Sequence, residues 1–509
     1  MWKKQSKLIA AIAIVIIIVV GIVVVWYVTR PPPAPRKVTW SVIAGFYTDA
    51  MNKIAKDFTE KTGIQVEVIG IDNTVLYEKE VMELAAKTGA YDVVTIETMW
   101  MSEWSLAHYL EPLDEYIAKT PKEEINFEDI LPHYRVLLSR GTHTYGLPYY
   151  TFDQGSIFRA DLYERKDIQD LYFNTYGRAL RKPDHTMTWE EYYDICKFFS
   201  KVVPQEWVTQ PGKTFYGLSM MAGRFGESQD EFMALLWGHG MDWVDKDYNI
   251  IINNELGVKC MQQYVDFLAL AAPNSIEITY DGCVGNLRSG ICQGFLQFFL
   301  DQWPNAIKTE QEVPGAKMGI GTPVGGRGYT GVFAVGMSAD SKHKADAWEW
   351  IKYLSGAKAQ KDFALMGGST CRRSVLYDPE FYSTPELAHK YAHLKAIADS
   401  AALLETLPDW EKPPRIFMLP QSAKIYVGPF IDVMSLLANH QKTAKEAADL
   451  MADEIAKISG WYPEHKPPAG WTPGFEKLSL PVFKEQYLSW LFQPLCLVGA
   501  ILPSLKRPD

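Results

Sequence analysis

Hydrophobic and polar positions begin to alternate regularly at about residue 38, after a long apolar run. The segment VTWSVIA, which starts at Val38, is typical of a β-strand. Residues 51–58 then carry apolar side chains at i, i+3, i+4 and i+7, and Gly63 ends this helical pattern. The alternating segment IQVEVIGI predicts a second strand. Because a helix-length crossover joins the two strands, the pattern predicts a parallel α/β sheet.

Polar and aromatic residues follow each of the first three predicted strands. GFYTD, with Asp49, follows the first strand and IDNT, with Asp72, follows the second. The third strand, YDVVTI, breaks into ETMW, which contains Glu97 and Trp100. The carboxyl ends of parallel strands meet at one edge of a sheet, where ligands bind. We therefore predict that these four residues lie on the rim of a ligand site.

The segment before the first strand is apolar enough to enter a membrane. More than twenty uncharged residues lie between Lys7 and Arg30, enough to cross a hydrocarbon layer of ~30 Å. The length favours an uncleaved anchor over residues 1–30, with a cleaved signal segment as the alternative. Prolines in residues 31–37 predict a semi-rigid spacer. The expected localisation is the cell membrane, with the binding region extracellular.

The C-terminal region has a different character from the rest of the chain. Residues 461–486 are punctuated by proline and predict a linker, and residues 487–509 carry an uncharged run that ends in basic residues. The run is short for a membrane span and contains Pro494. Membrane association, docking on the protein and a disordered tail all remain open for this segment.

Composition and motifs exclude several classes of function. The chain has 51 Lys+Arg against 61 Asp+Glu, so we expect no nucleic-acid partner. The sequence contains no GxSxG elbow, HExxH helix or phosphate loop. We therefore expect no enzyme, no cofactor and no metal site. A glycosidase stays a minor alternative because it needs only two well-placed carboxylates.

Several segments, in order, resemble the extracellular solute-binding proteins of ABC importers, in the maltose-binding family 1 branch. They include IAKDFTEKTGIQVEV, YDVVTIETMWMSEWSLAHYLEPLDEY, MTWEEYYDICKFFSK and YTGVFAVGMSADSKHKADAWEWIKYLSG. The resemblance implies an α/β fold, a type II two-lobe periplasmic-binding-protein-like clamp in which each lobe is a sheet flanked by helices. It implies an ABC permease with separate ATPase subunits as partner, and a carbohydrate, favoured as an oligosaccharide, as ligand.

The family's connectivity divides the chain between the two lobes. Lobe 1 is expected to comprise residues 38–150 and 330–367, and lobe 2 residues 151–329 and 368–460. The chain is expected to cross between the lobes near residues 148–151, 328–332 and 367–373. Glycines in the last two crossings suit a hinge, because glycine tolerates large changes in φ and ψ.

The resemblance also implies ligand contacts at these crossings and at strand ends. Sugars expose apolar C–H faces between hydroxyl groups, so their sites combine aromatic platforms with hydrogen-bonding groups. Phe333 is expected in the core instead. The candidate contacts, together with the rim residues Glu97, Asp49 and Asp72, are Trp100, Trp303, Tyr149, Tyr150, Asp153, Tyr329, Arg372 and Tyr426.

The ligand and the cysteines leave alternatives open. ETMW lacks the acidic and basic pair found after this strand in some maltose binders, so maltose itself is not implied. The adjacent Tyr149 and Tyr150 allow ferric iron, and an acidic cleft allows a polyamine. Cys283 and Cys292 are the favoured pair for a disulfide, with free buried thiols as the alternative.

Overall fold

The computed structural model describes residues 16, 18–21, 36–406 and 414–474. The predicted membrane anchor, the spacer and the C-terminal hydrophobic segment lie largely or wholly outside these residues. Within the described ranges, no helix combines the length and the apolar character needed to span a membrane.

The first sheet has five strands in the order β2-β1-β3-β10-β6. β1 pairs in parallel with β2 and β3, whereas β10 is antiparallel to β3 and β6. The parallel sheet predicted from the alternating segments is therefore confirmed for its first three strands. The strand bounds are β1 Lys37–Ile43, β2 Gln65–Ile71, β3 Val93–Glu97, β6 Gly146–Thr151 and β10 Val332–Met337.

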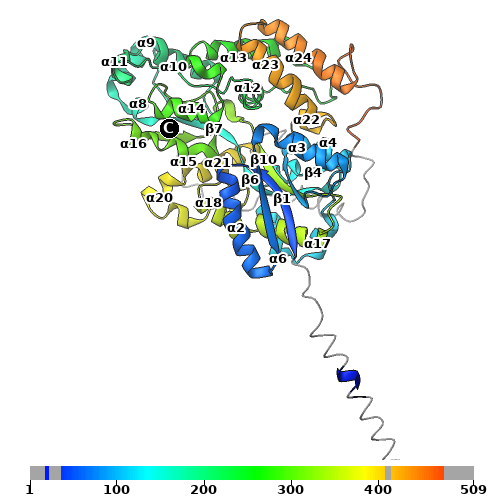
Figure 1. Cartoon of the computed structure of the whole chain (residues 1–509). Coiled ribbons are helices and arrows are strands. Elements are labelled where there is room, and N and C mark those ends of the chain that lie inside the picture. Colours follow the sequence, from blue (N-terminus) through cyan, green and yellow to red (C-terminus); the bar gives the residue numbers. More distant parts are fainter. Residues whose placement is uncertain (1–15, 17, 22–35, 407–413, 475–509) are drawn as a thin grey trace, which may run out of the picture.

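Helices cover the first sheet and bury its apolar residues. In α2 (Phe46–Thr62), the residues at helical spacing are buried, and Gly63 ends the helix with φ 72°. α17 (Lys344–Ser355) packs on β10 and β6, and its Trp350 lies 5.6 Å from Trp40 of β1, between ring centroids. Figure 1 shows α2 and α17 beside this sheet. The other elements associated with this sheet are α3 Asn73–Ala86, α4 Met101–Leu106, α5 Asp114–Lys119, α6 Lys122–Ile125, α7 Pro132–Leu137, β4 Ser139–Arg140, β5 His143–Thr144 and α18 Ala357–Leu365.

The second sheet has three strands in the order β8-β7-β9 and carries its own helices. α10 (Trp189–Lys201) begins with a capping box, in which Thr188 and Glu191 satisfy each other's backbone N–H groups. The elements of this region are β7 Gln154–Arg159, α8 Ala160–Glu164, α9 Lys166–Tyr176, α11 Gln205–Val208, α12 Glu227–Gly238, α13 Glu255–Leu268, α14 Tyr280–Arg288, β8 Phe298–Phe299, α15 Trp303–Ala306, α16 Thr309–Glu312 and β9 Met318–Gly321.

Segments distant in sequence lie together where the chain passes between the two sheets. The Phe152 N–H donates to the Gly331 carbonyl at 3.1 Å, and the Thr151 hydroxyl donates to the same carbonyl at 2.9 Å. The Ser369 hydroxyl donates to the Thr151 carbonyl. A Cβ atom at Gly331 would lie 2.2 Å from the Phe152 ring. Glycine is therefore required at this position by the close approach of the Phe152 ring.

The C-terminal helices contact both regions (Figure 1). α24 (Ala444–Ser459) packs on α13, whereas α22 (Ser422–Ile425) packs on α4 beside the first sheet. A π-helical turn over Tyr426–Phe430 joins α22 to α23 (Ile431–Ala438), and such turns are frequent at functional sites. The remaining helices are α19 Arg373–Leu376, α20 Pro385–Lys390 and α21 Ala392–Thr406.

Candidate functional site

A cavity of about 340 Å³ lies between the two regions, at the carboxyl ends of the parallel strands. The first sheet contributes Glu97 at the end of β3 and Tyr150 near the end of β6, and the second region contributes Asp301 and Asp230. We call this cavity the interlobe cleft. Its lining consists of Ile43, Tyr47, Asn73, Thr74, Tyr77, Glu78, Glu97, Trp100, Tyr150, Phe152, Arg224, Phe225, Gly226, Glu227, Asp230, Tyr280, Phe299, Asp301, Gln302, Phe333, Tyr426, Val427 and Ile431.

Aromatic rings form a large part of the cleft wall. Trp100 follows β3 in a 3-10 turn, and its ring centroid lies 5.4 Å from Tyr77 and 5.4 Å from Trp104. The Trp100 indole Nε1 is buried and has no hydrogen-bond partner among the described residues. Phe333 belongs to the buried strand β10, as expected, but also lines the cleft. The Trp100 side chain therefore gives the cleft an aromatic surface, and its Nε1 is a donor that the described part of the protein does not use.

Two tyrosines and one aspartate form a hydrogen-bonded group across the cleft. The Tyr150 hydroxyl donates to Asp301 Oδ2 at 2.5 Å, and the Tyr47 hydroxyl lies 2.7 Å from that of Tyr150 and 3.2 Å from the same carboxylate oxygen. Tyr47 stands on α2 and Tyr150 on β6, whereas Asp301 follows β8. These contacts connect the first sheet with the second.

Other cleft carboxyl groups also accept hydrogen bonds from tyrosines. The Tyr329 hydroxyl donates to Glu97 Oε1 at 3.0 Å, and the Tyr426 hydroxyl donates to Asp230 Oδ1 at 3.1 Å. Tyr329 comes from the segment before β10, and Tyr426 from the π-helical turn. Glu227, one turn before Asp230 on α12, completes the acidic group.

Burial raises the pKa values of these carboxyl groups. Desolvation raises the pKa of Glu97 to about 8, against the hydrogen bond from Tyr329. Desolvation likewise raises the pKa of Asp301 to about 6 and that of Glu227 above its ordinary value. The pKa of Asp230 is raised well above its ordinary range by desolvation and then by the charges of Glu97 and Glu227. At neutral pH the neutral form of Glu97 is therefore favoured, whereas Asp301 is mostly ionised.

Two candidate residues at the first crossing lie in the core instead of the cleft lining. Tyr149 is fully buried, and its ring meets Trp40 edge-on at 5.3 Å between centroids. Asp153 accepts a hydrogen bond from the Tyr134 hydroxyl, and its Oδ1 lies 3.2 Å from the Thr151 hydroxyl. Burial raises the pKa of Asp153 to about 7. Tyr149 and Tyr150 therefore do not direct both hydroxyls into the cleft, because strand alternation separates them.

Arg372 makes a set of buried contacts within the first-sheet region. Its Nη2 donates to the Ile125 carbonyl at 2.6 Å, its Nη1 to the Asn126 carbonyl at 3.0 Å, and its Nε to the Ser355 carbonyl. Asp129 lies 3.3 Å from Nη1 and supplies the opposite charge. With its donors engaged in this way, Arg372 joins segments of the protein and does not line the cleft.

Trp303 is also buried outside the cleft lining. It is the first residue of α15, its indole Nε1 donates to the His389 carbonyl at 2.7 Å, and its ring meets the His389 ring edge-on at 5.3 Å. The flanking residues Asp301 and Gln302 line the cleft. The strand-turn segment is therefore at the site, but Trp303 itself packs away from it.

The two aspartates predicted on the rim stand beside the cleft. Asp49 is exposed in the first turn of α2. Asp72 caps α3, accepting hydrogen bonds from the Thr74 N–H at 2.9 Å and the Thr74 hydroxyl at 2.6 Å. These bonds lower the pKa of Asp72. Their neighbours Tyr47, Asn73 and Thr74 line the cleft instead.

Sequence reasoning missed several residues of the cleft. Tyr47 lies within GFYTD, and Asp301 lies two positions before Trp303, so each stood beside a residue that was selected. Glu227 and Asp230 lie in GRFGESQD, a segment whose role the sequence did not indicate. Their position depends on how α12 meets the π-helical turn, a contact between segments about 200 positions apart.

The cysteine prediction is wrong for its favoured pair. Cys283 and Cys292 are both free and buried, as are Cys196, Cys260 and Cys371. The Ser219 hydroxyl donates to the Cys283 sulfur at 3.3 Å. Burial raises the pKa of the Cys292 thiol to about 12, so this thiol stays protonated and unreactive. Cys496 lies outside the described residues.

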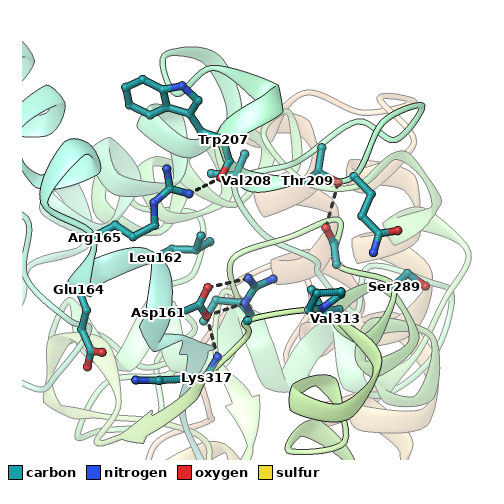
Figure 2. A pocket seen from close by; sticks show the side chains of 15 residues that line it. Asp161, Leu162, Glu164, Arg165, Trp207, Val208, Thr209, Ser289, Val313 and Lys317 are labelled. Carbon is teal, nitrogen blue, oxygen red and sulfur yellow. Dashed lines mark hydrogen bonds and ion pairs between the residues drawn. The ribbon is translucent and has the colours of Figure 1, made fainter.

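A second cavity, of about 530 Å³, lies within the second region alone. Figure 2 shows Arg165 beside Trp207, to whose carbonyl its guanidinium donates. Asp161 accepts two hydrogen bonds from Arg159 and one, at 2.9 Å, from the Lys317 N–H. Arg159 and Asp161 therefore pair within the lining, whereas Arg165 and Glu164 form ion pairs with Asp167 and Lys182 outside it. Because its lining comes from one region, closure of the two sheets would not enclose it.

Among the described residues, no group of three or more His, Cys, Asp or Glu side chains is arranged to hold a metal ion. Aromatic rings and carboxyl groups form much of the lining of the interlobe cleft. This combination binds polar molecules with apolar faces.

Comparison with known proteins identifies the family. Residues 47–361, more than half of the chain, match the family of bacterial extracellular solute-binding proteins. The chain belongs to this family. The resemblance seen in the ordered segments is confirmed, and the two-lobe α/β fold with it.

Individual relatives are distant in sequence but similar in fold. A probable amino-acid ABC transporter periplasmic-binding protein of Sinorhizobium fredii is 22% identical over 359 residues, which cover 68% of this chain and 74% of the relative. An ABC transporter solute-binding protein from Agrobacterium radiobacter K84, solved with ribitol, has a TM-score of 0.67 at 22% identity and covers 84% of this chain and 100% of its own. A maltose-bound protein of T. maritima has a TM-score of 0.64 at 19% identity and covers 83% and 99%, respectively.

Proposed function

We propose that the chain is the extracellular substrate-binding subunit of an ABC importer, which captures a carbohydrate between two lobes and delivers it to a membrane permease. Separate ATPase subunits supply the energy. The observation that carries the proposal is the interlobe cleft, where Trp100 and Tyr150 of one region face Asp230 and Asp301 of the other.

The cleft chemistry suits a hydroxylated ligand. Carboxyl oxygens accept hydrogen bonds from sugar hydroxyls, and aromatic rings cover the C–H faces between them. The cavity of about 340 Å³ lies at the lower end of the ~300–1,000 Å³ typical of small-ligand sites. This volume favours a short carbohydrate or a polyol over a long oligosaccharide. Because both regions contribute contacts, a ligand would stabilise closure of one on the other.

The relatives support a carbohydrate more than another solute. The Agrobacterium radiobacter protein was solved with ribitol and the T. maritima protein with maltose. The Sinorhizobium fredii relative is described as a probable amino-acid transporter component, which makes amino acids the competing class. The cleft favours a carbohydrate because, among its lining residues, Arg224 is the one side chain able to pair with a carboxylate.

We propose that residues 1–30 anchor this receptor in the membrane, with the cleft outside the cell. This part of the proposal rests on the apolar sequence between Lys7 and Arg30. The division of residues 38–460 between two lobes is part of the same proposal.

Binding without turnover is the expected activity. Titration calorimetry of the full-length chain in detergent, against ribitol, mannitol, maltose and a set of free amino acids, should give saturable binding for one carbohydrate class. Glu123→Gln, a change at an exposed surface acid, serves as the control for Trp100→Ala, which should weaken binding. Saturable binding of amino acids alone would refute the proposal, and release of reducing ends would identify a glycosidase.

Ferric iron is a weaker alternative in this geometry. The Tyr149 hydroxyl lies 3.5 Å from that of Thr95 in the buried core, away from that of Tyr150. An iron site with two phenolate ligands would give a visible absorption band on addition of ferric citrate, and we expect none.

A further inference from the structure

The charges of the interlobe cleft are unbalanced. Four carboxyl groups line it, those of the buried Glu97, Asp230 and Asp301 and of the half-buried Glu227. Among the described lining residues, Arg224 alone has a basic side chain, and its guanidinium lies 2.5 Å from a carboxylate oxygen of Asp432 in an exposed ion pair. These carboxyl groups therefore have no positive charge of the protein beside them in the lining.

Among the described residues, the side-chain donors to these acids are neutral groups, namely tyrosine hydroxyls and the Gln302 amide. Tyr329 donates to Glu97, Tyr426 to Asp230, and Tyr150 to Asp301. A tyrosine hydroxyl donates a hydrogen bond to a carboxylate but leaves its negative charge uncompensated, whereas a cationic donor also supplies the opposite charge. Ionised carboxylates in a buried cleft need a paired opposite charge.

Two polar atoms in the cleft wall lack a partner. Asp301 is only 8% exposed, and its Oδ1 accepts no hydrogen bond from the described residues. Trp100 is 3% exposed, and its indole Nε1 donates to none. The first atom requires a donor and the second requires an acceptor. A ligand hydroxyl group can meet either need, and an ammonium group can meet the first while also supplying the missing positive charge.

We propose that the ligand of this cleft carries a protonated amine beside its hydroxyl groups, as an amino sugar or an aminopolyol does. The ammonium group lies among the four carboxyl groups, and a ligand hydroxyl oxygen accepts from Trp100 Nε1. The inference rests on the proposed carbohydrate-binding function and specifies its substrate class.

The titration of the cleft acids gives the proposal a pH signature. Glu97 faces Tyr329, Glu227 and Asp230, and burial raises its pKa to about 8. A bound cation favours the ionised carboxylates, so its affinity should rise between about pH 6 and 8 as these groups lose their protons. A neutral sugar gains nothing from that ionisation.

The surroundings of Asp301 also leave its carboxyl group without a basic partner. Its carboxyl group faces the hydroxyls of Tyr47 and Tyr150 and the amide of Gln302, while Asp153 adds a negative charge nearby. Burial raises the pKa of Asp301 to about 6. Within the part of the chain that the structure describes, no basic side chain contacts the Asp301 carboxyl group.

Matched ligand pairs test the proposal on the full-length chain. The pairs are glucosamine with glucose and N-methylglucamine with sorbitol, and spermidine serves as an amine without hydroxyl groups. Glucosamine carries a weakly basic amine that loses part of its charge by pH 8, so the comparison between pH values uses N-methylglucamine, whose amine stays protonated. Calorimetric titrations at pH 6 and pH 8 should show that N-methylglucamine binds at least about tenfold more tightly than sorbitol at pH 8, as expected for a charge-assisted contact. The preference should shrink at pH 6.

Variants distinguish a charge effect from a change of shape. Glu97→Gln and Asp301→Asn should each reduce the affinity ratio of amine to neutral ligand by about five- to tenfold, because they remove charge at nearly constant volume. The exposed change Glu123→Gln should leave the ratio unaltered. If Glu123→Gln also lowered the affinity ratio of amine to neutral ligand, the preference for amines would come from the long-range field of the protein's charges and not from contact with the cleft acids. That result would overturn the assignment to the cleft.

The possible results separate the two proposals. Equal or tighter binding of glucose or sorbitol than of their amino counterparts would overturn the amine inference and leave the carbohydrate function intact. Binding of spermidine with no binding of any hydroxylated ligand would overturn both, since it would show that hydroxyl groups are not recognised.

Discussion

Replacing Trp303 with phenylalanine should lower the stability of the protein without weakening ligand binding. Trp303 is fully buried, and its indole N–H donates to the His389 carbonyl at 2.7 Å. Phenylalanine keeps an aromatic ring but removes this donor and the second ring of the indole. The change therefore acts on packing between α15 and the segment around His389, and not on the cleft lining.

The expected magnitude follows from the two groups that are lost. The hydrogen bond contributes about 1 kcal/mol to the free energy of unfolding. The smaller side chain leaves a void that costs about 1 kcal/mol more at the usual rate per unit of cavity volume. Trp303→Phe should therefore lower the free energy of unfolding by about 2 kcal/mol.

Trp100→Phe is the matched change inside the cleft. It makes the same chemical replacement at a residue whose Nε1 has no protein partner among the described residues, so it should cost less stability and reduce ligand affinity by about tenfold. Denaturant unfolding followed by circular dichroism measures stability, and calorimetry measures affinity for the ligand that the screen identifies. A stable Trp303→Phe variant with tenfold weaker binding would refute this assignment of the two tryptophans.

Three further changes test other parts of the structure. Arg372→Met should lower the free energy of unfolding by about 3–5 kcal/mol, because it leaves the Asp129 carboxylate without its buried cationic partner. Denaturant titration measures this loss, and weakened ligand binding in a variant of normal stability would contradict the structural role of Arg372. Since burial raises the pKa of Glu97 to about 8, the folded protein holds a proton that the unfolded chain releases, and stability should fall by roughly 1 kcal/mol per pH unit between about pH 5 and 8. Glu97→Gln should flatten that slope in thermal unfolding across pH, and an unchanged slope would exclude Glu97 as its source. Gly331→Ala places a Cβ atom 2.2 Å from the Phe152 ring, so it should lower both the stability of the protein and the rate of ligand-induced closure. Stopped-flow fluorescence follows the closure, and wild-type stability and rate would show that the crossing accommodates the added atom.

The alternation of strands and loops was enough to locate one wall of the cleft. Three parallel strands end at the same edge, so GFYTD, IDNT and ETMW had to come together there, and Tyr47, Thr74 and Trp100 from these segments line the cavity. Which residue of each segment turns inward was less predictable. Asp49 and Asp72 are used to begin helices, and an acidic residue at a helix start has that local role whether or not a ligand is near.

The residues assigned by resemblance depend on contacts that are distant in sequence. Arg372 was a candidate because it follows a crossing, but carbonyl groups from Ile125 and Asn126, about 250 positions earlier, engage its donors. Asp230 was not selected, because its place in the cleft depends on Tyr426 from the C-terminal part of the chain. A position near a crossing narrows the choice of residues, but tertiary partners decide which ones remain available to a ligand.

The hydrogen bonds that cross the cleft connect ligand binding with the movement of the two regions. Tyr47 and Tyr150 belong to elements of the first sheet, and their hydroxyls meet the Asp301 carboxylate of the second. Rotation about the neighbouring crossing at Phe152 must break or lengthen these contacts, because the three residues stand on opposite sides of it. The protein therefore already has contacts that favour closure, and a ligand needs to add only the remaining difference in free energy between the two states. A cation beside Asp301 would strengthen this arrangement, since an ionised carboxylate accepts from the two tyrosines more strongly than a neutral one. The same carboxyl group would then recognise the ligand and hold the two lobes together.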